Sequence, residues 1–321
     1  MFRSEIGFWS GGRRAGALLA VLACFGAMLG WAGVAEAAGR CAIGVAGQTE
    51  RVAVGNTGRS VLLHLPAGFD PARPAPVVFL FHGSTGDGQR MLAASRLAEA
   101  SDRHGFIVVA PDGGIPVQGG FVWNIPGVPT VAGAVPGPQD ADDVAFVGAA
   151  IDWLVEAGCA DGARVYATGL SGGGRMTSWL GCVSSDRFAA IAPVVGLRAG
   201  NPLAEEPGRP DPATCRPDRP MPVIAFAGDA DTVNPIEGGG AGYWQYTMQA
   251  AEQRWAQLNG CTDPPTTSWV KAGLYEERYV GCRDGAEVVG RITVGGGHVW
   301  LADNDAMWAF LSRFRREPPS R

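Results

Sequence analysis

Residues 164–175 read RVYATGLSGGGR, and this stretch decides the fold. A run typical of a β-strand, ending near Thr168, is followed by the tight turn GLSGG at 169–173 and then by a helical pattern. A serine flanked by glycines at G-x-S-x-G is typical of a nucleophile turn, because the serine backbone is strained and larger neighbours would clash. The motif alone arises by chance in glycine-rich chains. Its strand–turn–helix setting predicts that Ser171 is a nucleophile.

Short runs rich in Val, Ile and Phe alternate with longer amphipathic runs on both sides of this turn. The strands are expected near 51–54, 60–65, 76–82, 106–110, 164–168, 189–194, 222–227 and 289–294, and the helices over 88–104, 142–157, 173–183, 241–258 and 303–315. This alternation predicts an α/β protein with a mostly parallel sheet covered by helices on both faces. A nucleophile turn of the G-x-S-x-G kind in such a sheet is typical of an α/β-hydrolase. Two antiparallel strands are expected to lead in.

The composition excludes several classes of protein. The 321 residues are 46 % hydrophobic and 18 % charged, with a net charge of −5, which is too apolar for a disordered chain and too mixed for a polytopic membrane protein. The acidic balance and the lack of long basic runs argue against a nucleic-acid partner. Of the classes considered, the composition fits a globular protein.

The N-terminus has the pattern of an export signal. Arg13 and Arg14 precede an apolar run over 15–34, and Ala35-Glu36-Ala37 supplies a small-x-small cleavage site. We therefore expect a signal peptide at 1–37 and a single catalytic domain at 38–321, secreted to the periplasm or outside the cell. An uncleaved membrane anchor and a lipid on Cys24 are the alternatives, and the export route stays open.

Six cysteines follow the predicted signal peptide, and an even number in an exported chain predicts up to three disulfides. Cys261 is expected to pair with Cys282, since two strand-like runs between them can fold back as a hairpin. The remaining pairs are then Cys182 with Cys215 and Cys41 with Cys159. No C-x-x-C pair or Cys/His cluster is present, so no zinc site is expected.

A serine nucleophile needs a general base and an acid that orients it. The chain has four histidines, and His298 is the only one after Ser171, where the α/β-hydrolase order places the base. The acid should follow a strand between them. The predicted strand 222–227 runs into GDADTV, in which both Asp229 and Asp231 qualify. Asp229 could instead cap the turn, and spacing does not choose between the two acids.

Two backbone amides should stabilise the oxyanion formed when an ester carbonyl is attacked. Gly172, the residue after the nucleophile, should give one. The other should come from the loop HGSTG at 82–86, where we favour the Ser84 amide and keep Thr85 as the alternative. His82 precedes the nucleophile and is expected to be a buried structural histidine.

Two stretches, 112–140 and 197–220, interrupt the alternation and are rich in Gly or Pro. Long loops inside a compact domain are often functional. Trp123 and Trp300 are candidates to line the acyl or alcohol pocket, with an ordinary core position as the alternative for each.

The motifs taken together resemble a known family. HGSTG (82–86), VYATGLSGGGRMT (165–177), GDADTVNP (228–235) and GGGHVW (295–300) keep the order seen in secreted polyhydroxybutyrate depolymerases, feruloyl esterases and acetylxylan esterases. Family members usually carry H-G-T-A-D in the acid loop, so the resemblance implies Asp231 as the acid.

The sequence thus predicts an exported serine carboxylic-ester hydrolase that works through an acyl-enzyme on short hydroxyalkanoate or acyl esters, as a polyhydroxybutyrate depolymerase does. The alternative substrates are feruloyl or acetylxylan esters of plant cell walls. A non-catalytic hydrolase-like binding protein is the rival of another class, but it would have lost a member of the triad. The expected partner is a small or oligomeric ester. No metal or organic cofactor and no stable membrane insertion after cleavage are expected, and the oligomeric state is open.

Overall fold

The computed structural model describes residues 40–316, so the predicted signal peptide lies outside the described residues. The main strands are β1 (Thr49–Ala53), β2 (Ser60–His64), β3 (Ala75–Phe81), β4 (Ile107–Pro111), β7 (Ala160–Leu170), β8 (Ala190–Val194), β9 (Val223–Gly228), β10 (Thr266–Lys271), β11 (Leu274–Tyr279) and β12 (Val288–Thr293). A small hairpin is formed by β5 (Ile115–Val117) and β6 (Gly120–Val122). The helices are α1 (Gly88–Ser95), α2 (Leu97–His104), α3 (Asp143–Glu156), α4 (Gly172–Val183), α5 (Met248–Asn259) and α6 (Asn304–Leu311), with a 3₁₀ turn at Arg283–Gly285.

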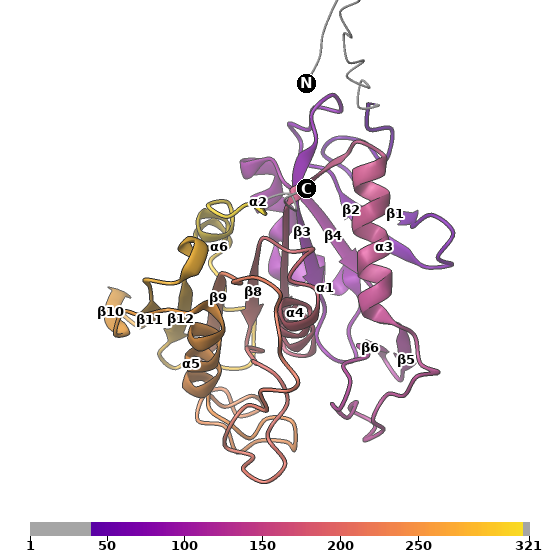
Figure 1. Cartoon of the computed structure of the whole chain (residues 1–321). Helices are drawn as coiled ribbons and strands as arrows, with labels where there is room; N and C mark the ends of the chain where they lie inside the picture. The colour runs from indigo at the N-terminus through magenta and orange to yellow at the C-terminus, as the bar shows by residue number, and fades with distance from the viewer. Residues whose placement is uncertain (1–39, 317–321) are drawn as a thin grey trace, which may run out of the picture. The chain divides into compact units, whose positions relative to one another are not determined.

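The main sheet has ten strands in the order β1-β2-β4-β3-β7-β8-β9-β12-β11-β10 (Figure 1). Its six central strands, from β4 to β12, are parallel, while β1 and β2 at one end and β10 and β11 at the other pair antiparallel. The structure therefore confirms the mostly parallel sheet of an α/β-hydrolase and the two antiparallel leading strands. The carboxyl ends of the parallel strands lie at one edge, where ligands bind in such sheets.

Helices cover both faces of the sheet, and the buried strand residues alternate between them. Phe79 and Phe81 pack into one hydrophobic cluster together with residues of α3, α4 and α5. Val78 and Leu80 point the other way and pack with residues of α1, α2 and α6. This alternation follows from the two-residue period of a strand, and it explains why β3 reads as continuously hydrophobic.

Three predicted helices are shorter than the sequence pattern indicates, and one of them, α6, ends at Leu311 instead of residue 315. The pattern over 88–104 is divided at Arg96, whose φ of 54° is left-handed, so that α1 ends and α2 begins there. The pattern over 241–258 becomes helical only at Met248, because the Thr247 side chain accepts the amide of Ala250 as an N-cap. The β5–β6 hairpin inside loop 112–140 was not predicted.

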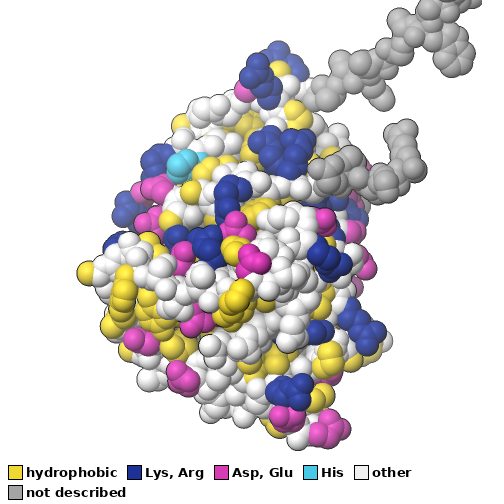
Figure 2. Space-filling model, turned by 60° about the vertical axis from the view of Figure 1, so that its left-hand side comes forward, with side chains coloured by type: hydrophobic (Ala, Val, Ile, Leu, Met, Phe, Trp, Pro, Cys, Tyr) yellow, Lys and Arg dark blue, Asp and Glu magenta, His cyan; other side chains and the backbone are white. Residues whose placement is uncertain are grey.

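The three predicted disulfides are present: Cys41–Cys159, Cys182–Cys215 and Cys261–Cys282. The last closes the stretch that contains the β10–β11 hairpin, as expected. The surface carries acidic and basic side chains interspersed over the face shown in Figure 2. Among the helices of residues 40–316, none combines the length and the hydropathy needed to cross a membrane.

Candidate active site

Ser171 lies in the turn between β7 and α4, at the carboxyl edge of the sheet. Its backbone has φ 55° and ψ −111°, a conformation that non-glycine residues rarely adopt. The turn is fixed on both sides, since the Ser171 amide donates to the carbonyl of Val194 at 2.9 Å and its own carbonyl accepts the amide of Arg175 at 2.9 Å. The hydroxyl is thus presented from a strained, well-supported backbone, as in a nucleophile elbow.

The glycines around Ser171 are needed for close packing of backbone on backbone. A Cβ atom on Gly173 would lie 2.1 Å from the carbonyl oxygen of Phe81, and one on Gly169 would lie 2.7 Å from the same oxygen. Neither contact is possible for a real side chain, so β3 and the start of α4 approach this closely only because glycine occupies both positions. The physical reason inferred from the motif therefore holds in the structure.

His298 and Asp231 are hydrogen-bonded to each other. The Nδ1 atom of His298 lies 2.8 Å from Oδ2 of Asp231, whose side chain is almost fully buried. The other carboxylate oxygen accepts the amides of Val233 at 2.8 Å and Asn234 at 2.9 Å. A carboxylate can accept all three of these bonds. That carboxylate holds the proton of neutral His298 on Nδ1 and leaves Nε2 free to accept another.

Asp229 has a different position. Its carboxylate accepts the amide of Gly295 at 2.6 Å, so it shapes the loop that carries His298 and does not contact the imidazole. The alternative that spacing left open, a turn-capping role, describes this residue.

Ser171 and His298 are brought to the same edge of the sheet by the ends of β7 and β12, but among residues 40–316 the Ser171 hydroxyl forms no hydrogen bond to His298. Such bonds are often long or misaligned in a free enzyme and tighten when substrate binds. The loop around His298 has room for a small adjustment, since a Cβ on Gly295 or on Gly297 would meet nothing within 4 Å.

The two predicted oxyanion donors lie side by side. A Cβ on Gly172 would be 2.9 Å from the amide nitrogen of Ser84. The competing amide, that of Thr85, is already used, since it donates to the carbonyl of Phe121 at 2.9 Å. Of the two loop amides, Ser84 is therefore the one placed beside Gly172.

The β5–β6 hairpin supports this loop. The amide of Phe121 donates to the carbonyl of Gly86 at 2.9 Å, which completes a bridge between the hairpin and the loop. The Arg90 guanidinium donates to the carbonyl of Thr85 at 3.1 Å and also bonds the carbonyl of Gly119. Part of loop 112–140 thus serves to position the backbone at 83–86.

Trp123 is buried in the hydrophobic core, which is the alternative that the sequence left open for this residue. It is 5 % exposed and packs against Phe81 and His82 with its ring centroid 5.1 and 4.5 Å from theirs. Its indole N–H donates to the carbonyl of His82 at 2.8 Å. Trp123 therefore supports the oxyanion loop from beneath.

His82 has the structural role that was expected. Its ring accepts the amide of Gly113 at Nε2 (2.9 Å) and bonds the carbonyl of Gly83 through Nδ1 (2.8 Å). Burial lowers the pKa of His82 below its usual value. The neutral ring, protonated on Nδ1, satisfies both bonds.

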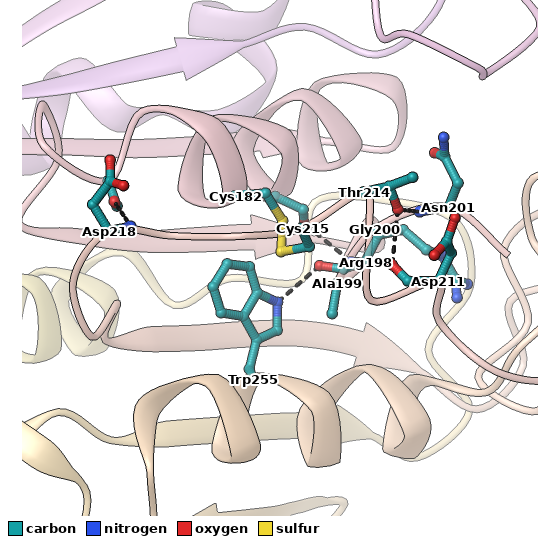
Figure 3. The surroundings of a disulfide bond; sticks show 12 residues. Cys182, Arg198, Ala199, Gly200, Asn201, Asp211, Thr214, Cys215, Asp218 and Trp255 are labelled. Atoms are coloured by element: carbon teal, nitrogen blue, oxygen red, sulfur yellow. Dashed lines mark hydrogen bonds between the residues drawn. A yellow bond between two sulfur atoms is a disulfide. The ribbon is translucent and has the colours of Figure 1, made fainter. Parts of the chain in front are cut away.

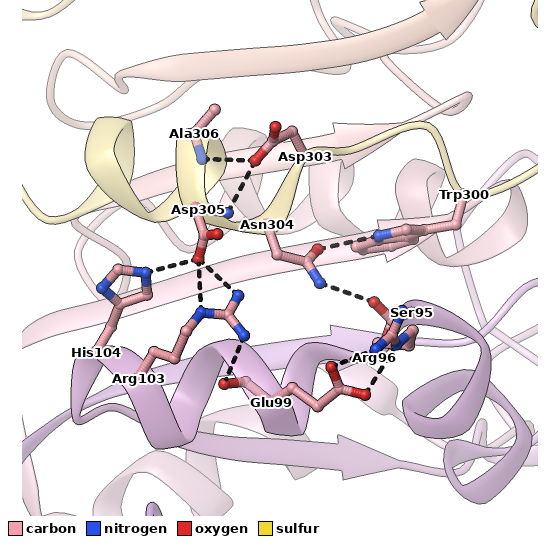
Figure 4. A network of polar contacts seen from close by, with 10 residues as sticks. All are labelled: Ser95, Arg96, Glu99, Arg103, His104, Trp300, Asp303, Asn304, Asp305 and Ala306. Carbon is pink, nitrogen blue, oxygen red and sulfur yellow. Dashed lines mark hydrogen bonds and ion pairs between the residues drawn. The ribbon is translucent and has the colours of Figure 1, made fainter.

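Trp300 is half-buried beside the second hydrophobic cluster. Its indole N–H donates to Asn304 at 3.1 Å, and Asn304 donates in turn to the carbonyl of Ser95 at 2.8 Å (Figure 4). The adjacent Asp305 accepts from Arg103 and lies 2.7 Å from the His104 ring. These contacts tie the segment after His298 to α1 and α2, so Trp300 has at least a positioning role.

Two residues beside the site, Asn234 and Arg175, were not predicted to have a role in it. The Asn234 side chain donates to the carbonyl of Val195 at 2.6 Å and so ties the acid loop to the strand-end next to Ser171. Arg175 is buried on α4, with Nη2 3.4 Å from the Ser84 hydroxyl. An arginine one turn into the helix after a nucleophile was the available signal. Within residues 40–316, no cluster of His, Cys, Asp or Glu has the geometry to hold a metal ion.

Comparison with known proteins shows that the chain is similar to several esterases. The family described as Esterase PHB depolymerase matches residues 59–207. Feruloyl esterase B of Piromyces equi is 33 % identical over 266 residues, which cover 80 % of this chain and 45 % of that protein. An esterase of Nocardia uniformis subsp. tsuyamanensis is 34 % identical over 191 residues, or 59 % of this chain and 49 % of that protein. The chain thus spans about half the length of these two relatives.

Among solved structures, an acetyl xylan esterase from Aspergillus awamori superposes with a TM-score of 0.56 at 18 % identity. The superposition covers 83 % of this chain and 99 % of that one. At this identity the likeness bears on the fold alone.

Proposed function

We propose that this chain, which has the fold of an α/β-hydrolase and matches the esterase PHB depolymerase family over residues 59–207, is a serine carboxylic-ester hydrolase. The observation that carries the proposal is the pair His298–Asp231, joined at 2.8 Å on loops at the sheet edge that also presents Ser171. Ser171, His298 and Asp231 are the proposed triad. A binding protein that had lost catalysis would not need this arrangement.

In the proposed mechanism, Ser171 Oγ attacks the ester carbonyl while Nε2 of His298 takes the hydroxyl proton. The bond between the carbonyl carbon and the alcohol oxygen then breaks, and His298 returns the proton to the leaving alcohol. Water repeats the sequence on the acyl-enzyme and releases the acid. Asp231 keeps the Nδ1 tautomer in place and stabilises the imidazolium that forms in both halves.

The negative charge of each tetrahedral intermediate is placed against the amides of Gly172 and Ser84. Their adjacency and the use of the Thr85 amide elsewhere support this assignment. Preorganised donors of this kind typically contribute about 3 kcal/mol of transition-state stabilisation each. Nothing in this sequence of steps requires a metal or an organic cofactor.

For the substrate, we propose short acyl esters and soluble hydroxyalkanoate oligomers, with feruloyl or acetyl esters of plant cell walls as the alternative. Because Trp123 is only 5 % exposed, its ring offers little surface for an aromatic acyl group. A groove lined by residues 82–87, Arg90, Met91, Ala94 and Leu170 runs beside the oxyanion loop and offers both apolar and polar contacts. The relatives named as feruloyl esterases keep the alternative open.

We also propose that the chain is exported, with residues 1–37 removed and residues 38–321 forming one catalytic domain. The three disulfides support an oxidising compartment.

The decisive experiment measures turnover of p-nitrophenyl acetate, methyl ferulate, acetylated xylan fragments and hydroxybutyrate oligomers by the mature chain and by Ser171→Ala. We expect the variant to lose about 10³-fold or more in kcat, because no other group can form the acyl-enzyme. Retention of full activity by Ser171→Ala would refute the mechanism. A kcat/KM for methyl ferulate more than about tenfold above that for the oligomers would shift the substrate proposal to aromatic acids.

A further inference from the structure

Two buried arginines next to the nucleophile turn are without an acidic partner. Arg175 lies one helical turn after Ser171 on α4, and Arg198 follows β8; they are 9 % and 6 % exposed. Within residues 40–316 neither arginine takes part in an ion pair, although most of the other buried or half-buried arginines do. The Nε and Nη1 atoms of Arg175 and the Nε and Nη2 atoms of Arg198 are buried with no hydrogen-bond acceptor.

Aromatic rings and one carbonyl hold the two guanidinium groups in place. Arg175 lies over the ring of Tyr243 at 4.0 Å, and Arg198 lies over that of Trp244 at 3.2 Å. Arg198 also donates to the carbonyl of Tyr246 at 2.8 Å. Cation–π contacts stabilise a charge but accept no hydrogen bond, so they leave the N–H groups available.

The backbone that carries Arg198 is held rigidly (Figure 3). The indole of Trp255 donates to the Arg198 carbonyl at 2.8 Å, and the Arg198 amide donates to Ser178 on α4 at 3.1 Å. The Cys182–Cys215 disulfide joins the end of the same helix to the end of loop 197–220. A site built on these elements would be preorganised before any ligand arrives.

A buried cation with unpaired donors is costly, and the cost is removed when an anion binds. Burial lowers the pKa of Arg198 to about 10, so the side chain stays charged at neutral pH. A small pocket lies between the two arginines, and its wall includes Ile125, Trp179, Asn201 and Tyr243. The apolar residues in this wall exclude water and strengthen an ion pair formed inside it.

We propose that Arg175 and Arg198 form a subsite for a carboxylate of the substrate. A planar guanidinium presents paired N–H donors that match a carboxylate in a bidentate geometry. The pocket is small, so it suits the end of a chain or a short acid and not a bulky group.

The subsite adjoins the reacting centre. A Cβ on Gly172 would be 3.5 Å from Nη2 of Arg175 and 2.9 Å from the amide of Ser84. Arg175 thus connects the pocket, which its side chain lines, to the backbone beside the nucleophile. This inference rests on the proposed ester hydrolysis and narrows it to esters with a free carboxylate close by, either on the alcohol, as in an ester of a 3-hydroxy acid, or on the acyl group, as in a half-ester of a dicarboxylic acid.

The test compares matched anionic and neutral substrates of the mature chain in a pH-stat at pH 7.5. For the alcohol side the pair is 3-acetoxybutyrate and 3-acetoxybutyramide; for the acyl side it is monoethyl succinate and ethyl succinamate. In at least one pair we expect kcat/KM to be tenfold or more higher for the anion, and that pair identifies the side. Equal or lower values for the anion in both pairs would overturn the proposal without affecting the proposed function.

Variants then test whether Arg175 causes the preference for the anionic substrate. In Arg175→Gln the ratio of anion to amide should fall to near one, and in Arg175→Lys it should be partly kept. Arg73→Gln removes the same charge from an exposed side chain and should leave the ratio unchanged. If Arg175→Gln retains the wild-type ratio, Arg175 is not part of a carboxylate subsite. Circular dichroism shows whether each variant folds, and the wild-type ratios decide the question if Arg175→Gln does not.

Binding separates failure of the subsite from failure of the proposed activity. Calorimetry on Ser171→Ala should give a Kd for 3-acetoxybutyrate or monoethyl succinate at least tenfold below that of the amide partner. If no ester is hydrolysed but this difference is found, the proposed function is wrong and the subsite stands. If esters are hydrolysed and the amides bind as tightly as the acids, the subsite is wrong.

Discussion

The two glycine-rich turns of the candidate site, 169–174 and 295–297, look alike in sequence and differ in packing. In the first turn, a Cβ on Gly173 or Gly174 would come within 2.1 and 2.7 Å of backbone oxygens in neighbouring strands or loops. In the second, Gly295 and Gly297 face open space, and only Gly296 is closely packed, against Thr293 and Gly228. Glycine thus lets two backbone segments pack closely in the first turn, whereas in the second turn it leaves space around the loop.

This difference matches the demands on the two side chains. A nucleophile on a rigid turn keeps its position relative to the oxyanion amides throughout the reaction. A base must exchange a proton first with the serine and then with the leaving group, so a small range of positions is an advantage. His298 is directed mainly by its bond to Asp231 and by the bond of Gly295 to Asp229. Packing fixes the serine, and polar contacts guide the histidine.

The largest expected effect tests whether the hydrogen bond to Asp231 orients His298. Asp231→Asn should lower kcat about 10³-fold or more, because an amide can hold the wrong tautomer of His298 and cannot stabilise the imidazolium. Asp229→Asn keeps an oxygen that can accept the Gly295 amide and should lose less than about tenfold. Steady-state kinetics on p-nitrophenyl acetate measures both. A greater loss in Asp229→Asn would show that the acid has been assigned to the wrong residue.

The second prediction tests the packing itself. Gly173→Ala places a methyl group against the Phe81 carbonyl, so we expect the free energy of unfolding to fall by about 3 kcal/mol or more, near the upper end for overpacking. Gly297→Ala meets no atom within 4 Å and should change it by less than about 1 kcal/mol. Urea unfolding followed by circular dichroism compares the two. Equal destabilisation would mean that the turns are equally packed.

The same contrast explains how much could be predicted from the sequence. Ser171, Gly172 and His298 stand in motifs whose spacing reflects local backbone needs, and their elements form where expected. The choice of Asp231 over Asp229 depended on family resemblance, because both acids follow β9 and only tertiary contacts separate them. The break at Arg96 had no signal in the sequence, since arginine is a good helix former and rarely adopts a left-handed backbone.

Contacts between distant segments were the main thing that could not be predicted. The Thr85 amide is occupied by Phe121, and Trp123 lies under His82, because loop 112–140 folds back on the oxyanion loop. The apposition of Arg175 and Tyr243 likewise joins α4 to a loop after β9. Composition marked these loops as unusual, but no periodicity in the sequence indicates which residues of two irregular segments meet.

The smallest expected effect concerns the pH dependence of the free energy of unfolding, to which the buried His82 contributes. The buried His82 has a pKa lowered by burial, so in the folded chain its ring stays neutral below the pH at which the unfolded chain takes up a proton, about 6.5. The unfolded state therefore binds more protons in this window, and the stabilisation that is complete above about pH 7 is lost as the pH falls below about 6.5.

Glu252 contributes in the opposite sense, because burial raises its pKa well above the usual value and favours the folded state at lower pH. The net slope of the wild type mixes the two groups, and a difference between variants separates them. In His82→Gln the slope of the free energy of unfolding against pH, between pH 5.5 and 7.5, should be less positive than in the wild type, because the contribution of His82 to that slope is positive. Urea titrations at four pH values give both slopes. If His82→Gln keeps the wild-type slope, the buried His82 is not a source of the acid sensitivity of the fold.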